Sequence, residues 1–300
     1  MVVSIVKRKR KPITGDTFFD ACILFILFVV CAITLYPVIY TLSVSISSIA
    51  AVERKEVWLW PVGFNIASYK LIANHPNILT SYANTLLYAS AGPAYSMVLT
   101  VCAAYALSRR WMYGRDVFML LFAFTMWFGG GLVPYYLLLR DLGLYDKRLA
   151  MIIPSAVSVW NIIVMRTAMQ QIPDSIEESA KLDGANDIVV MVRIMLPMSV
   201  PVLATITLFY IVGKYNEWFM PMILLPQKSM HPMPNVIREL LISYSDQTLN
   251  RDFFMGEELT PNPVSFRSAV VFITMIPLMV LYPFIQRYFI KGIMIGAIKG

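Results

Sequence analysis

The chain has 300 residues, of which 58% are hydrophobic and only 14% are charged, and its mean hydropathy is +0.65. These values exclude an ordinary soluble domain with a polar surface and indicate an integral membrane protein. Much of the net charge of +7 comes from Lys and Arg in predicted loops, where they set the orientation of membrane spans, so we expect no nucleic acid partner.

Six apolar segments are long enough to cross a bilayer, because a hydrocarbon core of about 30 Å needs about 20 helical residues. They comprise residues 18–46, 82–107, 117–139, 149–169, 200–225 and 266–290. The basic run KRKRK before the first segment resembles the start of a signal peptide, but the apolar run that follows is too long and has no convincing cleavage site. We therefore predict an all-α integral membrane protein with six transmembrane helices.

Positive charge predicts the topology of these spans. The four segments that six spans would leave inside carry 13 Lys and Arg in 71 residues, against 9 in 83 residues of the three outside loops. This bias follows the positive-inside rule and predicts cytoplasmic N- and C-termini. The chain then consists of a basic cytoplasmic arm at 1–17, a transmembrane domain at 18–290 and a cytoplasmic tail at 291–300.

The third span is interrupted by glycines at 129–131, followed by Pro134. Broken helices are tolerated where they line a cavity or are covered by protein, and close packing between helices explains the glycines almost as well. Tyr135, next to this break, and Trp160, in the fourth span, are candidates for stacking on a sugar ring. Aromatic residues near span ends also serve as anchors at the membrane interface.

The segment at 173–197 is unusually acidic for its place between two spans, with five Asp and Glu within fourteen positions. Ser175 and Glu178 have the spacing of a capping box, which predicts that a short helix begins there. Gly184 can take the left-handed conformation that ends a helix, and Asn186 or Asp187 can cap a second one. The sequence predicts a helix, a glycine turn and a second helix on the cytoplasmic side.

One face of the first short helix is expected to be apolar. Ile176 and Ala180 lie four residues apart, while Glu177, Lys181 and Asp183 point elsewhere and keep the segment solvated. An amphipathic linker that lies on the membrane surface would show a similar pattern.

The stretch EESAKLDGANDIVVMVRIMLP at 177–197 resembles the EAA loop of ABC importer permeases, whose pattern is EAA, three residues, Gly, nine residues, Ile, one residue, Leu-Pro. Ser179 replaces the middle alanine of the pattern. The resemblance implies that this loop docks into a cleft of a separate ATPase subunit. The residues that fall on the pattern are Glu178, Ala180, Gly184, Ile194, Leu196 and Pro197.

The resemblance extends over most of the chain, through the stretches GGGLVPYYLLLRDLGLYDKRLAMIIP, YNEWFMPMILL and QRYFIKGIMIGAIKG. These are similar to the MalG-type second permease of carbohydrate importers, and within it to the LplC-like branch, which includes permeases for alginate and pectin fragments. The resemblance implies a type I ABC importer (MetI-like) permease fold in a bacterial cytoplasmic (inner) membrane. It also implies that the end of the tail contacts the ATPase pair, through Gly296, Ala297, Ile298, Lys299 and Gly300.

The resemblance further implies a division of labour among subunits. A homologous second permease would complete the solute path, two ATPase subunits would bind ATP and Mg, and an extracytoplasmic binding protein would deliver an oligosaccharide, with acidic chains among the candidates. No GxxxxGK[ST] phosphate loop occurs in the chain. We therefore expect a transport subunit without an ATPase site, cofactor or metal of its own.

Four polar residues of the fifth span are spaced by three, four and three positions and so share one helical face: Thr207, Tyr210, Lys214 and Glu217. Either Lys214 and Glu217 neutralise each other, or this face lines a solute path in which Lys214 meets a carboxylated sugar. Asn216 points away from the face and is expected to bond to a neighbouring helix.

Two other functions have weaker support in the residues. An ion-coupled secondary transporter would need Glu217 as its coupling carboxylate, and the neighbouring Lys214 disfavours that role. A membrane-embedded enzyme would need paired carboxylates, a histidine cluster or a serine with a base, and the predicted spans have none of these.

Overall fold

The computed structural model describes residues 15–249 and 262–297, which are almost entirely helical. Within these ranges the only β-type pairing is an isolated bridge between Ser47 and Phe64, so the predicted all-α fold is confirmed there. The described residues divide into two compact units. One comprises 15–71 and 262–273, and the other comprises 72–249 and 274–297.

The first unit contains α1 (Gly15–Ser45), α2 (Ile49–Glu53) and most of α3 (Ala67–Ala73). The loop after α2 folds back onto the end of α1, where the hydroxyl of Ser43 donates to the carbonyl of Leu59 at 2.6 Å. Gly63 closes this loop with φ at +64°, and a Cβ there would lie 2.9 Å from Oγ of Ser48. Glycine is therefore required at this position both by the backbone conformation and by the lack of space.

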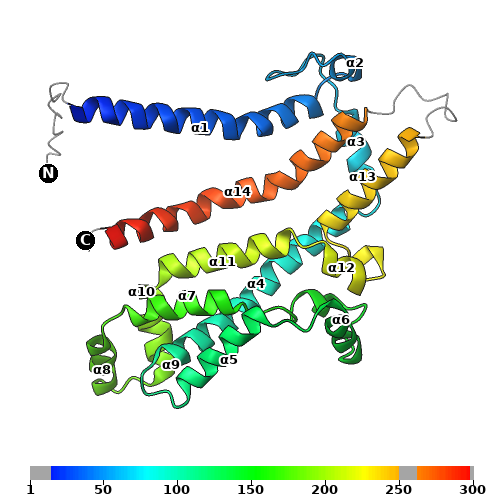
Figure 1. Ribbon diagram of the computed structural model, residues 1–300. Helices are drawn as coiled ribbons and strands as arrows, with labels where there is room; N and C mark the ends of the chain where they lie inside the picture. Colours follow the sequence, from blue (N-terminus) through cyan, green and yellow to red (C-terminus); the bar gives the residue numbers. More distant parts are fainter. Residues whose placement is uncertain (1–14, 250–261, 298–300) are drawn as a thin grey trace. The chain divides into compact units, whose positions relative to one another are not determined.

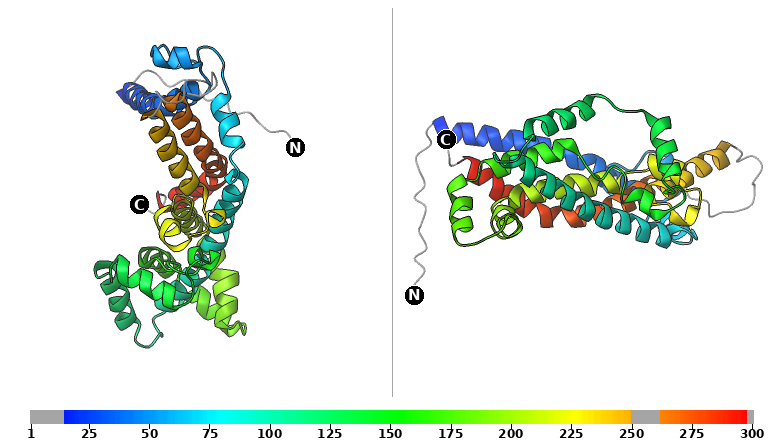
Figure 2. Two further views of the ribbon diagram at one scale, coloured as in Figure 1. Left: turned by 90° about the vertical axis from the view of Figure 1, so that its right-hand side faces the viewer. Right: turned by 90° about the horizontal axis from the view of Figure 1, so that it is seen from below.

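The second unit is built around α4 (Ile78–Ser108), against which α7 (Val159–Gln170) and α11 (Val200–Tyr215) lie side by side (Figures 1 and 2). Large apolar side chains from α7 and α11 are fully buried against α4, among them Ile162, Met165 and Ile206. Burial of one such side chain contributes roughly 1.5–3 kcal/mol, so the three helices form a stable frame.

The remaining elements of the second unit extend from this frame. Figures 1 and 2 show α8 and α9 at one end of α4 and α11, and α12 and α13 at the other end. Helix α14 begins in the first unit and ends in the second. The bounds are α5 Arg115–Trp127, α6 Leu132–Asp141, α8 Asp174–Leu182, α9 Asp187–Val190, α10 Leu196–Met198, α12 Phe219–Leu224, α13 Met233–Leu249 and α14 Pro263–Ala297, with short η1 (Arg148–Met151), π-helical η2 (Met191–Met195) and η3 (Lys228–Met230).

Three of the described helices are long and apolar enough to cross a membrane alone, within α1, α4 and α14. They coincide with the predicted first, second and sixth spans. Two bent pairs qualify when each is counted as one span: α5 with α6, bent by 115°, and the segment 187–198 with α11, bent by 86°. The predicted fifth span contains a further break, because α11 ends at Tyr215 and α12 begins at Phe219.

The prediction of one continuous helix at 149–169 is wrong. The chain forms the 3₁₀ turn η1, then a non-helical stretch, and α7 begins only at Val159, with Ser158 as its N-cap. Pro154 restricts the residue before it, and Ser155 has φ at +59°, so both interrupt a helix. The 12 residues of α7 span about 18 Å at 1.5 Å per residue, which is less than the hydrocarbon core.

The predicted break in the third span is confirmed, and only one of its three glycines has a left-handed backbone conformation. Gly131 has φ at +82° and forms the start of α6. A Cβ placed on Gly129 or Gly130 would meet no atom within 4 Å, so close packing inside this chain does not account for these glycines. The turn itself needs the conformational freedom of glycine.

The expected tail lies partly in α14. Gly296 and Ala297 belong to its last turn, whereas Ile298, Lys299 and Gly300 lie outside the described residues. Most of the predicted arm at 1–17 lies outside them as well.

Candidate functional site

The acidic segment forms two short helices joined by a glycine turn, as predicted. Helix α8 ends in a turn where Gly184 has φ at +84°. The N–H of Gly184 donates to the carbonyl of Lys181 at 3.0 Å, and the N–H of Ala185 donates to that of Ala180 at 3.0 Å. This pair of bonds is a Schellman motif, which satisfies carbonyls that the helix end would otherwise leave free. Asn186 then caps α9, since its Oδ1 accepts from the N–H of Val189 at 2.9 Å.

The predicted capping box at the start of α8 is wrong. Pro173 occupies the N-cap position, and no side chain caps this end. Because the helix begins at Asp174, Ser175 already lies in its first turn, and its side chain is not placed to accept from the amide of residue 178. Asp174 and Glu177 instead place negative charge in the first turn, which the helix dipole favours.

A buried ion network fixes α8 to the end of α4. Glu177 is only 7% exposed and pairs with the guanidinium of Arg109, which is 4% exposed. Arg109 also donates through Nε to the hydroxyl of Ser108 at 2.9 Å. Lys181 completes the network, since its ammonium lies 2.9 Å from Glu177 and 3.1 Å from Asp187 on α9. The expectation that Glu177 points into solvent is therefore wrong.

The pKa values of this network follow from its contacts. Burial raises the pKa of Glu177, but the hydrogen bond from Lys181 and the charge and hydrogen bond of Arg109 together outweigh it, so the net pKa of Glu177 is lowered. The hydrogen bond to Glu177 raises the pKa of Lys181 above its ordinary value, against the effect of desolvation. Both groups are held in their charged forms at neutral pH.

Sequence reasoning singled out Glu178, placed Glu177 on the solvated side and overlooked Arg109. Glu177 and Arg109 are 68 positions apart, and the arginine belongs to a short loop that the acidic pattern does not include. The available signal was an arginine directly after the second span, on the same predicted side of the membrane as five acidic residues.

The residues on the EAA pattern separate into an inner and an outer group. Ala180, Ile194 and Leu196 are half-buried, and Ala180 and Leu196 pack against the core of α4, α7 and α11. The exposed ones are Glu178, Ser179, Gly184 and Pro197. Apolar side chains accompany them on the outside, because Leu182 is 89% exposed and Ile188 is 68% exposed. Exposed apolar groups beside charges are typical of a surface that binds another protein.

The residues of the predicted polar face of α11 have different surroundings. Tyr210 is buried and structural, since its hydroxyl is hydrogen-bonded to Thr100 at 2.7 Å and accepts from the N–H of Ser158 at 3.2 Å. The ammonium of Lys214 lies 2.9 Å from the carboxylate of Glu217, and the two side chains are 10% and 25% exposed. The ion-pair interpretation of these two residues is thus the one that the geometry supports.

The other predicted path residues lie apart from this pair. The hydroxyl of Tyr135 on α6 is hydrogen-bonded to Ser155 at 2.9 Å, and Trp160 is 58% exposed on α7. The expectation that Asn216 bonds to a neighbouring helix is wrong, because its amide donates to the carbonyl of Val212 in the preceding turn.

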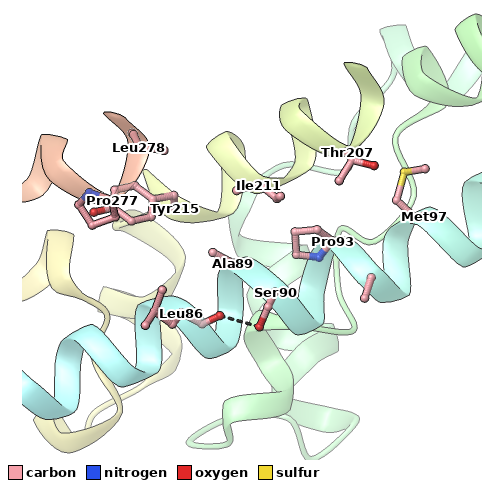
Figure 3. A pocket seen from close by; sticks show the side chains of 11 residues that line it. Leu86, Ala89, Ser90, Pro93, Met97, Thr207, Ile211, Tyr215, Pro277 and Leu278 are labelled. Carbon is pink, nitrogen blue, oxygen red and sulfur yellow. Dashed lines mark hydrogen bonds between the residues drawn. The ribbon is translucent and has the colours of Figure 1, made fainter. Parts of the chain in front are cut away.

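A cavity of about 430 Å³ lies between α4, α11 and α14, and Figure 3 shows its lining. Thr207 and Ser90 contribute hydroxyls, but both donate to carbonyls of their own helices, to Leu203 at 2.7 Å and to Leu86 at 2.6 Å. The remaining lining is apolar except for Tyr215, whose hydroxyl donates to the carbonyl of Thr274. A hydrated sugar would find few partners there, so this cavity alone is no sugar site.

Comparisons with known proteins agree with this arrangement. Residues 16–295 match the family described as "Binding-protein-dependent transport system inner membrane component". Protein LplC of Bacillus subtilis (strain 168) is 35% identical over 282 residues, covering 94% of this chain and 95% of LplC. The polygalacturonan/rhamnogalacturonan transport system permease protein YtcP of the same organism is 35% identical over 285 residues, covering 95% and 99%.

A solved structure is similar over almost the same range. It is the crystal structure of a bacterial ABC transporter involved in the import of the acidic polysaccharide alginate, and one of its chains matches with a TM-score of 0.81 and 34% identity. The match covers 93% of this chain and 100% of that chain. A match to the family over nearly the whole chain, together with relatives of this identity and coverage, shows that the chain belongs to the binding-protein-dependent transport system inner membrane components, the permease subunits of ABC importers.

Proposed function

We propose that this chain is the permease subunit of an ATP-driven importer of acidic oligosaccharides built from uronic acids. The observation that carries this proposal is chemical. Two similar proteins are named or described for polygalacturonan/rhamnogalacturonan and for alginate, and each of these polymers carries a carboxylate on its sugar rings. A shared permease architecture at about a third identity favours a shared substrate class.

The chain acts mechanically in this function. A second permease completes the path, a binding protein delivers the oligosaccharide, and two partner subunits bind and hydrolyse ATP with Mg. One of them docks on the exposed surface of α8 and α9, around Glu178, Leu182 and Ile188. The buried pair of Arg109 and Glu177, with the exposed Lys181 beside it, then transmits its movement to α4. The chain itself needs no cofactor, and the end of α14 adds a second contact to the ATPase pair.

Reconstitution of the full transporter tests this function. Proteoliposomes with internal ATP and the loaded binding protein should accumulate trigalacturonate, and should take up its fully methyl-esterified form more slowly. Uptake that persists without ATP and stops when an ion gradient is collapsed would instead support a secondary transporter. In the structure the carboxylate of Glu217 is already paired with Lys214, which disfavours it as an ion-coupling group.

A further inference from the structure

A small cavity lies at the end of α4 and α11 opposite to α8 and α9. It has a volume of about 240 Å³. Its lining comes from α12, α13 and the turn between them: Met222, His231, Asn235, Arg238, Glu239 and Ile242. The topology predicted from the sequence places this end of the chain outside the cytoplasm. None of the predicted site residues belongs to this cavity.

The turn beside the cavity is held firmly by α4. Asn84 donates to the carbonyls of Ser229 at 2.8 Å and His231 at 3.2 Å. The hydroxyl of Thr85 accepts from the N–H of Met233 at 2.7 Å. The ring of His231 is itself hydrogen-bonded to the carbonyl of Leu225 at 2.7 Å. The start of α13 is thus positioned before any ligand arrives, and preorganisation of this kind favours binding.

Arg238 supplies a charge that the described residues do not neutralise. Its guanidinium carbon lies 3.9 Å from the centre of the Trp218 ring, a stacked position that leaves the N–H groups at the guanidinium edge free to donate. Among the side chains that the structure describes, no carboxylate pairs with it. The neighbouring Glu239 pairs with Lys228, which offsets its repulsion of an anion.

Asn235 fixes Trp218 beneath this charge. The side chain of Asn235 is buried, and its amide nitrogen donates to the carbonyl of Trp218 at 2.9 Å. This bond holds the residue on which the guanidinium of Arg238 stacks.

We propose that this cavity binds one uronate ring of the oligosaccharide as it enters the permease. Arg238 binds the carboxylate with its planar edge, while the ring of Trp218 supports the face of the guanidinium. The cavity has room for a single pyranose ring. A neutral sugar would leave the guanidinium unpaired, so the cavity selects for acid. This inference rests on the proposed function and names the residues that would give it its substrate class.

Equilibrium binding to the purified complete transporter, measured without binding protein, tests the proposal. The probes are trigalacturonate and its fully methyl-esterified form, which has the same backbone without charge. Arg238→Met should weaken binding of trigalacturonate about tenfold, the effect of losing a charge-assisted hydrogen bond, and leave binding of the ester unchanged. Arg140→Met, which removes an exposed arginine elsewhere on the same predicted side, is the matched control and should change neither.

A second variant tests whether the ligand lies in the cavity. Met222→Trp fills the cavity without altering its charges and should weaken trigalacturonate binding as Arg238→Met does. Unchanged trigalacturonate binding in either variant, or equal loss for acid and ester in Arg238→Met, overturns the proposal. So does a result in which Arg238→Met weakens only capture of the loaded binding protein. If these results contradict the cavity but the wild-type transporter still imports trigalacturonate, the proposed function stands. If vesicles with the wild-type transporter import no oligosaccharide, the proposed function itself is contradicted.

Discussion

Arg109 and Glu177 show how a single buried pair can connect the segment at 173–197 to a long apolar helix. Removing one partner of a buried ion pair leaves an uncompensated charge and destabilises by about 3–5 kcal/mol in the cases measured. Lys181 remains beside Glu177 and offsets part of this loss. The pair therefore acts as the attachment point of α8, and it can be tested separately from the residues that face solvent.

Arg109→Met should detach α8 from α4 and reduce the amount of ATPase that copurifies with the permease pair. The double variant Arg109→Met with Glu177→Gln should recover part of this amount, because no buried charge is left without a partner. The measurement is the ATPase-to-permease ratio after size-exclusion chromatography. Arg110→Met is the matched control. The side chain of Arg110 is 87% exposed, and its nearest carboxylate, on Asp174, lies at 3.9 Å, so this ion pair contributes little. Equal loss in Arg109→Met and Arg110→Met would contradict the assignment.

The lowered pKa of Glu177 predicts an acid-sensitive attachment. A carboxyl whose pKa is lower in the folded state contributes to stability above its unfolded pKa of about 4.3, and loses this contribution as pH falls through the folded value. A spin label at Leu182→Cys, with Cys22, Cys31 and Cys102 replaced, should become more mobile as pH falls below about 4. With Glu177→Gln the label should be mobile at every pH. An unchanged acid transition in that variant would assign it to another carboxylate.

Lys214 and Arg238 should respond differently to the charge of the substrate. Lys214 is paired with Glu217 and packs its stem near Gly92, so Lys214→Met should slow import of trigalacturonate and of its methyl ester alike. Arg238→Met should slow only the acid. Initial uptake rates in proteoliposomes measure both. A selective loss for the acid in Lys214→Met would show that the solute path reaches this pair after all.

Among the elements, the glycine turn between α8 and α9 depends on backbone conformation rather than on space. A Cβ on Gly184 would meet no atom within 4 Å, so φ at +84° is the only obstacle to a side chain. Asn tolerates this region better than β-branched residues do. Gly184→Val should therefore impair ATPase binding without removing the protein from the membrane. Gly184→Asn should retain most of the ATPase binding. Wild-type transport in Gly184→Val would refute a role of this turn in coupling.

The elements that were predicted correctly are those whose sequence signals lie within the element itself. Apolar length identified α1, α4 and α14, and Gly184 identified the turn after α8, because these signals are local. Pro154 and Ser158 were visible in the sequence, yet the apolar run around them suggested a continuous span. There a local helix stop and start outweighed the average hydrophobicity of the segment. At α8 the error was different, because Pro173 and not Ser175 occupies the N-cap position.

The contacts of the candidate sites could not be predicted in the same way. Arg109 meets Glu177, and Asn84 meets the turn before α13, only because α4 brings both ends of the second unit together with segments far along the chain. A single sequence identifies no such pair; for Arg109 it shows only that an arginine and the acidic segment lie on the same predicted side of the membrane. The same holds for Tyr210, since its place on a polar helical face did not reveal that its hydroxyl connects α4 to the start of α7.

At the scale of the whole molecule, the end of α14 offers a test of how the chain is coupled to its partners. A chain stopped after Lys291 loses the last turns of α14 and the three residues beyond it. We expect it to insert and to pair with the second permease, but to show weaker substrate-stimulated ATPase activity in the purified complex. Ordering a chain end costs about 1–2 kcal/mol per residue, so a tail that binds must make contacts that offset this cost.

A shorter truncation is the control for this experiment. A chain stopped after Ala297 keeps all of α14 and loses only the last three residues. Reduced activity in both variants would assign the ATPase contact to residues 298–300. Reduced activity only in the chain stopped after Lys291 would assign the contact to the end of α14. Activities equal to the wild type in both would leave coupling through this subunit to the segment at 173–197.

The segment 187–198 and α11 meet at a bend of 86°, so the segment acts as a short lever arm nearly perpendicular to α11. The arm is about 18 Å long at 1.5 Å per residue, so a rotation of about 10° at the bend moves its far end by about 3 Å. The joint is Ser199, which is 3% exposed, with a π-helical turn before it and Pro201 after it. An ATPase subunit that pulls α8 by a few ångström would therefore rotate α11 about a buried pivot instead of pushing it along its axis. Rotation is the motion that closes one end of a helix bundle as it opens the other.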